Sequence, residues 1–465
     1  MLDAVAILDV GKTNSKLTLW QASRLIARET RTNAVHGDFL DVKGIEAWVE
    51  ITLRAFAKLA RITAIVPVGH GAAAALIVGN QLLAPPRDYE AYADPVEQTA
   101  YHAERDAFAE TGSPALPHGL NLGFQLHVAE RDNQLGPGTQ VLLWPQYWAW
   151  RLCGVAAAEL TSLGCHTDLW CPRKRDFSAL AKRRGWASKF PPIRGASEVL
   201  GVVTPEWQTR SSLSADCAVH CGLHDSNAAL LAARGHPEIG QSDATVLSTG
   251  TWFVALRSLD AADAGKDIVL PEGRDCLFNV DVAGRPVPSG RFMGGREAEI
   301  IAGLDSRAIT VGYDPAALLA RLPMLVDAEA MALPSFVSQV GPFPNGKARW
   351  LNAPDNAIDK RAVTGLYLAL MADALMTLIG SKKSLLIEGR FAEAQVFVRA
   401  LATLRRDLNV YVANAHDDVP YGALRLLDPT LPPFHPLTPV EPLDLDLSAY
   451  VTRWRTGADA LEMVA

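Results

Sequence analysis

The sequence lacks concentrated positive charge. Its 465 residues carry a formal net charge of −7, and the short basic clusters at residues 173–175 and 182–184 are scattered along the chain. A protein that binds a polyanion needs a surface on which positive charges gather. We therefore expect no nucleic-acid partner, and we interpret these clusters as solvated surface.

The distribution of apolar and charged residues also shows no secretory leader and no apolar run of membrane-spanning length. The apolar stretch near the N-terminus is interrupted by Asp9 and Lys12, and no basic segment precedes it, unlike a signal peptide. We see no apolar run that reaches the roughly 20 residues of a membrane span. These features predict a cytoplasmic protein with no membrane partner.

Cysteine is scarce, and its spacing is not that of a metal site. The chain has six cysteines and no CxxC pair, and in a cytoplasmic protein we expect them to be reduced. Cys165, Cys171, Cys217 and Cys221 have histidines nearby, as zinc ligands do, but the spacing does not fit. We interpret these cysteines as buried free thiols.

The length and composition are those of a multidomain globular protein. Apolar residues make up 49% of the chain and charged residues 20%, which are ordinary values. A chain of 465 residues is long enough for two or more domains, each with its own core.

A hairpin near the N-terminus is the first motif that indicates chemistry. Residues 5–19 read as an apolar strand that ends at Asp9, a polar turn and a returning strand. Backbone N–H groups of such a turn can point into one concavity that binds phosphate, and a carboxylate at the strand end can hold Mg²⁺. The candidate phosphate-binding residues of the turn are Gly11, Lys12, Thr13, Asn14 and Ser15. The alternative is an ordinary hairpin with a polar turn.

A second hairpin of the same kind follows at residues 244–256. Its turn contains Thr249, Gly250 and Thr251 between two apolar strands. A unit repeated at this distance predicts two domains of similar construction that face each other. Two phosphate-binding turns suit a nucleoside triphosphate.

Asp225 lies at a strand-to-helix corner. Residues 216–222 read as a strand, and residues 226–234 read as a helix rich in Ala and Leu. Such a corner lies in the wall of a cleft rather than in a core. The alternative role for Asp225 is that of a helix cap, and the two roles are compatible.

The two hairpins, together with Gly222-Leu-His-Asp-Ser-Asn227, resemble the FGGY carbohydrate kinases, which belong to the actin-like ATPase superfamily. The resemblance covers roughly residues 3–428. The His-Asp pair and the Ser-Thr-Gly-Thr-Trp turn at residues 248–252 look most like the rhamnulokinase and fuculokinase branch.

The resemblance implies an α/β fold with two RNase-H-like domains that face each other across a nucleotide and sugar cleft. Residues 1–235 would form the sugar-binding domain with the catalytic Asp, and residues 236–428 the nucleotide-binding domain. Residues 429–465 would form a proline-rich linker and a terminal helix.

The resemblance also implies roles for single residues. Asp225 would be the general base, Asp9 would hold Mg²⁺, and the two turns would bind the phosphates of ATP. The adenosine would lie on Gly389. The sugar would lie beside Asp225, and its further contacts would be Gly71, His224 and Ser226.

The chain departs from the family pattern in two places. It has Glu388-Gly-Arg-Phe-Ala392 where relatives commonly have Gly-Gly-Gly-x-Ser, so only the central glycine carries over. It also has Gly69-His-Gly-Ala-Ala73 where relatives usually have Gly-x-Asp. The first departure puts the nucleotide preference in doubt, and the second the identity of the sugar.

The expected activity is therefore transfer of the γ-phosphate of ATP to a hydroxyl of a ketose or polyol. The ketose would resemble rhamnulose, fuculose, ribulose or xylulose, and the sequence does not choose among them. One alternative is a non-catalytic relative that senses sugar or nucleotide. Another is an actin-like or Hsp70-like ATPase that acts on a protein partner. A homodimer is among the assemblies that we consider.

Overall fold

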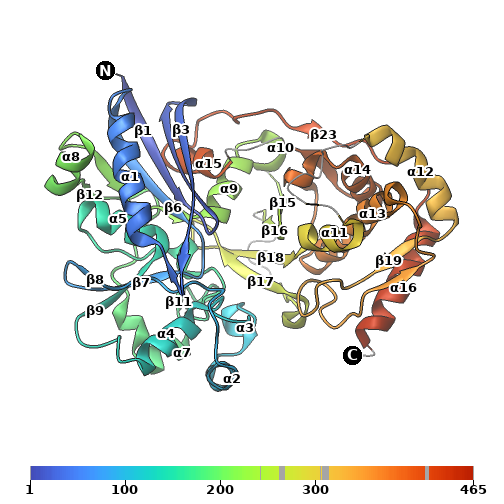
Figure 1. Cartoon of the computed structure of the whole chain (residues 1–465), viewed down its shortest axis with the longest axis horizontal. Helices are drawn as coiled ribbons and strands as arrows, with labels where there is room; N and C mark the ends of the chain where they lie inside the picture. The colour runs from blue at the N-terminus through green and yellow to red at the C-terminus, as the bar shows by residue number, and fades with distance from the viewer. Residues whose placement is uncertain are drawn as a thin grey trace. The chain divides into compact units, whose positions relative to one another are not determined.

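The chain divides into two compact units. The computed structural model describes residues 2–240, 242–260, 268–303, 305, 314–413 and 418–463 (Figure 1). The first unit comprises Met1–Gly235, Phe278–Pro286 and Asp417–Phe434. The second unit comprises His236–Leu277, Val287–His416 and His435–Ala465. Each unit therefore includes segments that are far apart in the sequence.

A mixed sheet forms the centre of the first unit. Its strand order over the described residues is β12-β13-β6-β1-β2-β3, and β14 also pairs with β6. The strands β1, β2 and β3 are antiparallel to one another, whereas β6 runs parallel to β1, β13 and β14. The strands are β1 (Asp3–Val10), β2 (Asn14–Gln21), β3 (Arg24–Thr32), β6 (Arg61–Gly69), β12 (Val199–Val202), β13 (Ala218–His220) and β14 (Leu223–His224).

Strand β1 is buried on both faces of this sheet. Its residues Ala6 and Leu8 share a core cluster with Ile45 and Val49 of helix α1 (Val42–Phe56), which covers one face (Figure 1). The intervening Ile7 belongs to a cluster with residues of α9 (Asp225–Ala233) and α15 (Asp418–Leu427). Because successive side chains of a strand point to opposite faces, both faces are apolar here.

A three-stranded sheet and short helices complete the first unit. The sheet has the order β8-β7-β9. Its strands are β7 (Ala74–Val78), β8 (Gln81–Ala84) and β9 (Thr139–Leu143). Four strands of two residues each form two further pairs: β4 (Val35–His36) with β5 (Phe39–Leu40), and β10 (Trp170–Cys171) with β11 (Asp176–Phe177). The helices are α2 (Pro95–Glu104), α3 (Phe108–Thr111), α4 (Leu122–Arg131), α5 (Trp144–Cys153), α6 (Leu160–Leu163), α7 (Ala179–Arg183), η1 (Trp186–Lys189) and α8 (Pro205–Ser211).

The second unit repeats the strand arrangement of the first. Over its described residues the order is β17-β18-β16-β15-β21-β22-β23. Strand β16 is antiparallel to β15 and β18, and β21 is parallel to β15 and β22, as β2 and β6 are in the first unit. The strands are β15 (Ala244–Thr249), β16 (Phe253–Ser258), β17 (Cys276–Val280), β18 (Pro286–Phe292), β21 (Ser384–Gly389), β22 (Asn409–Val412) and β23 (Thr438–Pro439), with β19 (Met331–Leu333) and β20 (Arg349–Leu351) as a separate pair.

Helix α13 is the central helix of the second unit. It contacts α11, α12 and α14. By length and composition its 22 residues could cross a membrane, but 78% of its most apolar window is buried inside the protein. The expectation that no apolar run reaches this length was therefore wrong, because a core helix that is enclosed on all sides is apolar all round. The helices of this unit are α10 (Pro237–Gly240), η2 (Glu272–Arg274), α11 (Gly294–Ala302), α12 (Pro315–Asp327), α13 (Ala357–Leu378), η4 (Arg390–Glu393), α14 (Gln395–Leu404) and α16 (Ser448–Met463).

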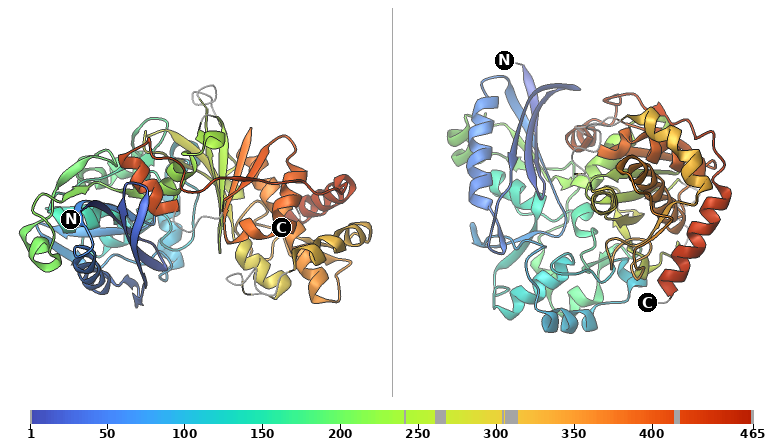
Figure 2. Two further views of the ribbon diagram at one scale, coloured as in Figure 1. Left: turned by 90° about the horizontal axis from the view of Figure 1, so that it is seen from above. Right: turned by 45° about the vertical axis from the view of Figure 1, so that its right-hand side comes forward.

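The C-terminal helix α16 packs onto the second unit beside β19 (Figures 1 and 2). The Tyr450 hydroxyl donates to the carbonyl oxygen of Ala330 over 2.7 Å, and Trp454 Nε1 donates to that of Ala332 over 2.7 Å. Both aromatic side chains are buried. The last segment of the chain is thus part of the core of this unit.

A buried ion pair provides a test of the packing in the second unit. Arg257 is 3% exposed and Asp243 is fully buried, with 2.7 Å between Nη2 and Oδ2. We expect Asp243→Ala to destabilise the protein by about 3–5 kcal/mol, because it leaves a buried guanidinium without its counter-ion. The measurement is chemical denaturation followed by circular dichroism.

The control is Glu198→Ala, which removes an exposed i,i+4 pair with Arg194. Its expected cost is below about 1 kcal/mol. Equal destabilisation by the two substitutions would contradict the importance of burial.

Candidate active site

The carboxyl ends of neighbouring parallel strands bring two carboxylates together. Asp9 of β1 lies opposite Val68 of β6, and Val68 lies opposite Leu223 of β14. Because these strands end at the same level, Asp9 and Asp225 meet at one edge of the sheet. Their charges are close enough to interact.

Asp225 is the first residue of α9 and remains partly exposed, with 29% of its side chain accessible. Its Oδ1 accepts hydrogen bonds from the backbone N–H of Ser226 over 2.5 Å and from the Ser226 hydroxyl over 3.2 Å. The carboxylate is therefore held by the start of its own helix and is still accessible to a ligand. The cap-like contact and an accessible carboxylate coexist, as the corner position predicts.

Asp9 has the environment of a cation ligand. It is partly buried. Desolvation and, to a smaller extent, the charge of Asp225 raise the pKa of Asp9 to about 7, against the opposing charge of Lys16. Two nearby carboxylates with little solvation favour a bound cation, and Mg²⁺ prefers carboxylate oxygens. The residues present therefore fit a magnesium ion.

The tip of the first turn is open to solvent. The backbone N–H of Gly11 donates to the carbonyl oxygen of Asn14 over 3.1 Å, which closes the turn. Thr13 and Asn14 are exposed, and Gly11 is partly so. The groups available to a ligand are thus the backbone and side chains of this tip.

Ser15 supports the turn from inside. It is fully buried, and its hydroxyl donates to Oδ1 of Asn33 over 2.8 Å. Asn33 Nδ2 in turn donates to the carbonyl oxygen of Gly11 over 2.8 Å. The structure therefore places Ser15 away from the exposed tip, where the sequence had suggested a phosphate donor.

Lys12 is held by acidic residues of the same unit. Its ammonium contacts the carboxylate of Asp88 and lies 3.5 Å from Oε2 of Glu90. It also lies 4.8 Å from the centre of the Tyr89 ring. No local pattern in the sequence indicates this pairing, because the partners are 76 positions apart.

Gly71 leaves room for two reactive side chains. A Cβ atom at this position would lie 2.9 Å from Cys165 Sγ and 2.9 Å from His224 Nε2. No side chain fits there without displacing one of them. The glycine therefore leaves the space in which the thiol and the imidazole meet.

His70 is a site residue that the sequence reasoning missed. It is buried, its Nδ1 donates to the carbonyl oxygen of Gly71 over 2.7 Å, and its ring packs edge-on against that of Tyr89 with 5.8 Å between the ring centres. Burial lowers the pKa of His70, while its bond to Gly71 and the charge of Asp225 raise it. Its position directly after β6 was the available signal.

The turn of the second unit is fastened to the neighbouring strand. Thr249 lies opposite Gly389 in the parallel pairing of β15 with β21. The Thr249 hydroxyl donates to the carbonyl oxygen of Glu388 over 2.5 Å and accepts from the backbone N–H of Phe391 over 3.1 Å. Gly389 has a φ of 86°, a conformation that favours glycine. Thr249 therefore links the turn to β21 and the segment after it by hydrogen bonds. Gly250 and Thr251 form the accessible part of the turn.

Helix α11 begins directly against this turn. The backbone N–H of Gly295 donates to the carbonyl oxygen of Thr251 over 3.2 Å. A Cβ atom on Gly295 would lie 2.2 Å from the carbonyl oxygen of Gly250, and one on Gly250 would lie 3.8 Å from Nη2 of Arg390. The arginine that replaces a glycine of the family pattern therefore lies beside the turn.

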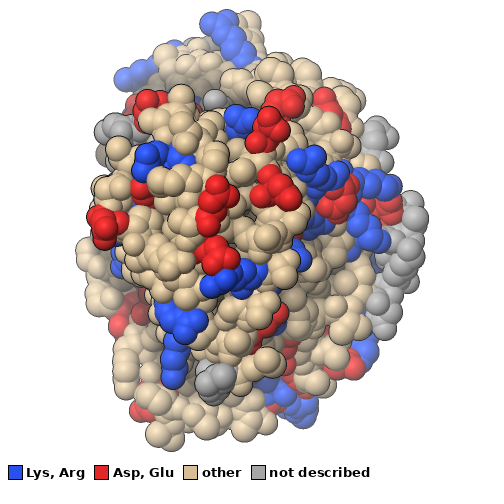
Figure 3. Space-filling model, turned by 90° about the vertical axis from the view of Figure 1, so that its right-hand side faces the viewer, with Lys and Arg blue, Asp and Glu red and all other residues tan. Residues whose placement is uncertain are grey.

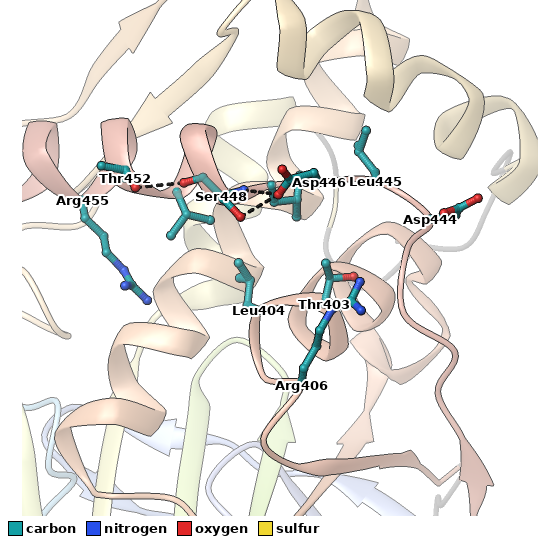
Figure 4. Close-up of a pocket in the computed structure, with 11 residues that line it drawn as sticks. Thr403, Leu404, Arg406, Asp444, Leu445, Asp446, Ser448, Thr452 and Arg455 are labelled. Carbon is teal, nitrogen blue, oxygen red and sulfur yellow. Dashed lines mark hydrogen bonds between the residues drawn. The ribbon is translucent and has the colours of Figure 1, made fainter.

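A surface hollow elsewhere in the second unit is not the candidate site. It has a volume of about 800 Å³ and lies between the end of α14 and the start of α16 (Figure 4). None of the residues singled out in the sequence lines it. Its charges oppose one another, because Arg406 and Arg455 lie among Asp444 and Asp446, and Arg455 is already paired with Asp373 over 2.6 Å.

The surface charges form a mixed pattern on the face shown in Figure 3. Basic and acidic side chains alternate across this face among the residues that the structure describes. The exposed pair of Arg453 with Glu329 is an example of opposite charges that neutralise each other at the surface of the second unit. Such mixing is typical of a solvated surface.

The comparisons with known proteins agree with this arrangement. The family model for the C-terminal domain of FGGY carbohydrate kinases matches residues 241–433. A solved carbohydrate kinase from Novosphingobium aromaticivorans is 47% identical, with 98% of each chain covered and a TM-score of 0.92. The chain belongs to the FGGY family of carbohydrate kinases. The expected α/β fold with two similar domains is thereby confirmed. No curated protein matches the kinase significantly.

More distant structures share the fold of the kinase. A xylulose kinase from Rhodospirillum rubrum has 17% identity, 99% coverage of both chains and a TM-score of 0.78. A glycerol kinase from Plasmodium falciparum, solved with ADP, has 12% identity, coverage of 99% of this chain and 98% of its own, and a TM-score of 0.78. Placement in the rhamnulokinase and fuculokinase branch stays a prediction.

The charge of Asp9 should cost stability in the ligand-free kinase. Since the folded protein raises the pKa of Asp9 to about 7, its carboxylate is protonated in the folded state and ionised in the unfolded state between about pH 4 and 7. Folding stability is therefore lost as pH rises through this window. We expect Asp9→Asn to raise the melting temperature without Mg²⁺, by an amount that grows from pH 5 to pH 7 and is then constant.

The matched control is Asp3→Asn on the exposed end of the same strand. Its effect on the melting temperature should not follow this pH dependence. A difference between Asp9→Asn and the wild type that is the same at pH 5 and pH 8 would contradict the assignment.

The close contact at Gly295 should not tolerate a methyl group. Gly295→Ala would place a Cβ 2.2 Å from a backbone oxygen of the second turn, so the turn or the helix must move. We expect a loss of stability of about 1–3 kcal/mol, measured by chemical denaturation. Gly273→Ala, where nothing lies within 4 Å, should be nearly neutral; equal effects would show that the packing at Gly295 is loose.

Proposed function

We propose that the kinase transfers the γ-phosphate of ATP to a hydroxyl of a ketose or polyol, with Asp225 as the general base. The observation that carries the proposal is the position of Asp225. Its partly exposed carboxylate lies at the strand ends, within electrostatic reach of Asp9. A base in this reaction must reach a substrate hydroxyl next to the phosphate-binding groups.

The nucleotide would be bound through the two turns. ADP in the distant glycerol kinase structure supports a nucleotide substrate. In the first turn the exposed groups of Gly11, Thr13 and Asn14 would contact phosphate oxygens. In the second, Gly250 and Thr251 would do so.

Three further residues would act in nucleotide binding. Arg390, which lies beside Gly250, would add a positive charge to the second turn. Gly389 would let the adenosine lie close to the backbone. Lys12 contributes only if it leaves Asp88, so we expect its role to be smaller than the sequence suggested.

Asp9 would hold the magnesium ion. The ion would neutralise negative charge on the phosphates during transfer. The residue supplies an oxygen ligand, and its raised pKa of about 7 indicates a place where a positive charge is favourable.

Asp225 would take the proton from the attacking hydroxyl as that oxygen bonds to the γ-phosphorus and ADP leaves. Its contacts with Ser226 fix the direction of the carboxylate. Phosphoryl transfer depends mainly on positioning and on stabilisation of charge. A fixed carboxylate and a few backbone donors are therefore sufficient protein groups.

The sugar would lie next to Asp225, with Gly71, His224 and Ser226 as its neighbours. A ketose is favoured by the resemblance to rhamnulokinases and fuculokinases and is compatible with the xylulose kinase that shares the fold. The segment after Gly71 has no acidic side chain. Recognition would therefore rely on His70 and His224. The cytoplasmic location and a homodimer stay predictions.

The test combines a substrate screen with one substitution. Wild-type kinase with Mg·ATP should release ADP only when a suitable sugar is present in a panel of ketoses and polyols. Asp225→Asn should then lower kcat on that sugar by at least about 100-fold, because the base is lost, with little change in ATP binding. ADP formation is measured in a coupled assay.

Asp216→Asn is the control, since Asp216 is an exposed acid of the same unit and should retain activity. Near wild-type turnover by Asp225→Asn would show that another group is the base. ATP turnover without any sugar would instead favour an ATPase that acts on a protein.

A further inference from the structure

A buried cysteine and histidine lie directly behind the proposed base. Cys165 Sγ is 3.3 Å from His224 Nε2, and the same Nε2 is 3.4 Å from Asp225 Oδ1. Cys165 is 3% exposed and His224 is 5% exposed. The three side chains thus form a continuous contact from the interior of the first unit to the carboxylate.

We propose that Cys165 and His224 form a thiolate–imidazolium pair that orients the carboxylate of Asp225, so that Cys165 is a positioning residue of the kinase. The proposal rests on the proposed function, in which Asp225 is the base. Cys165 lies too deep to be assigned contact with the substrate and would act through His224.

The local charges favour the ionised pair. Burial alone would raise the pKa of Cys165, but the charges of His166 and His224 outweigh it and lower the pKa to about 5. Burial likewise disfavours imidazolium, yet Cys165 and Asp225 raise the pKa of His224 to about 9. At neutral pH the thiol is therefore ionised and the imidazole is protonated.

Other titratable groups face the pair as well. The buried Glu159 stabilises the charge on His224, and His70 interacts with both His224 and Asp225. Lys12 acts on His70. The charge on His224 is thus stabilised by Glu159 as well as by Cys165 and Asp225.

Backbone and side-chain contacts fix the position of His224. Its backbone N–H donates to the Thr161 hydroxyl over 2.9 Å, and that hydroxyl donates to Glu159 Oε2 over 2.6 Å. The absence of a side chain at Gly71 leaves the space that Cys165 and His224 occupy. The imidazole therefore contacts the carboxylate of Asp225 from the interior of the unit, and Ser226 donates hydrogen bonds to the same carboxylate from α9.

Cys165 should be the one cysteine of the kinase that is ionised at neutral pH. Burial raises the pKa of Cys153, Cys171 and Cys221, and it raises the pKa of Cys217 and Cys276 to about 12. A thiolate signal in the folded protein thus reports on Cys165 alone.

The first experiment measures the pair without using activity. The ultraviolet absorbance of the thiolate is followed from pH 4 to pH 8 in the folded wild-type kinase, in Cys165→Ser and in the control Cys171→Ser. We expect one thiolate with a midpoint near pH 5, lost in Cys165→Ser and retained in Cys171→Ser. The absence of this signal in the wild type would overturn the pair, whatever the variants do.

The second experiment measures the effect on catalysis. Cys165→Ala and Cys165→Ser should lower kcat by about 10- to 100-fold, as expected for a displaced catalytic group, with KM for ATP unchanged within about twofold. The serine variant keeps a group that can hydrogen-bond to His224 but not the negative charge, so it should not restore activity. Cys171→Ser should have wild-type kinetics.

The acid side of the pH profile separates positioning from general structural damage. Wild-type kcat should fall as Cys165 is protonated near pH 5, and this limb should be absent in Cys165→Ser. Wild-type kcat in both Cys165 variants would overturn the positioning role. If Asp225→Asn is active while the thiolate signal is present, the proposed base is wrong and the pair itself stands.

Discussion

The fixed register of the parallel strands in the first unit is the constraint on which the candidate site depends. Asp9 and Leu223 both lie opposite Val68, so the strand ends deliver Asp9 and Asp225 to the same place. Packing on both faces of β1 holds this register, because a slip by one residue would exchange the side chains of two close-packed clusters and move Asp9 to the other face. Packing of the core around β1 therefore determines where the carboxylates of Asp9 and Asp225 lie.

Several ionisable side chains lie at these strand ends, where burial solvates their charged forms poorly. Asp9 has a raised pKa, and behind Asp225 a thiol and an imidazole shift each other toward their charged forms. Perturbed groups of this kind cluster where proteins do chemistry. At the turn of the second unit, Thr249 fixes the backbone by two hydrogen bonds and Gly295 by close packing.

Several features of the site were predictable because they are local. The two hairpins follow from apolar strands around short polar turns, and Asp225 follows from a strand that leads into an Ala-rich helix. The similarity of the two sheets follows from the repeated pattern. Three contacts were not predictable in this way: Ser15 is turned inward to Asn33, Lys12 is paired with Asp88, and Thr249 bonds to β21. In each case the partner lies on another segment, and no local pattern specifies it.

By itself the sequence determined the order of strands and turns, the family and the identity of the carboxylate at the corner, because periodicity and turn chemistry act between near neighbours along the chain. Only the tertiary structure decided which hydroxyls and cations remain available to a ligand, and that Cys165 lies against His224. Such contacts join residues 59 positions apart. These contacts depend on how the sheet and its helices pack against one core. Each side chain there fits the space and the charges left by several segments that are distant in the sequence.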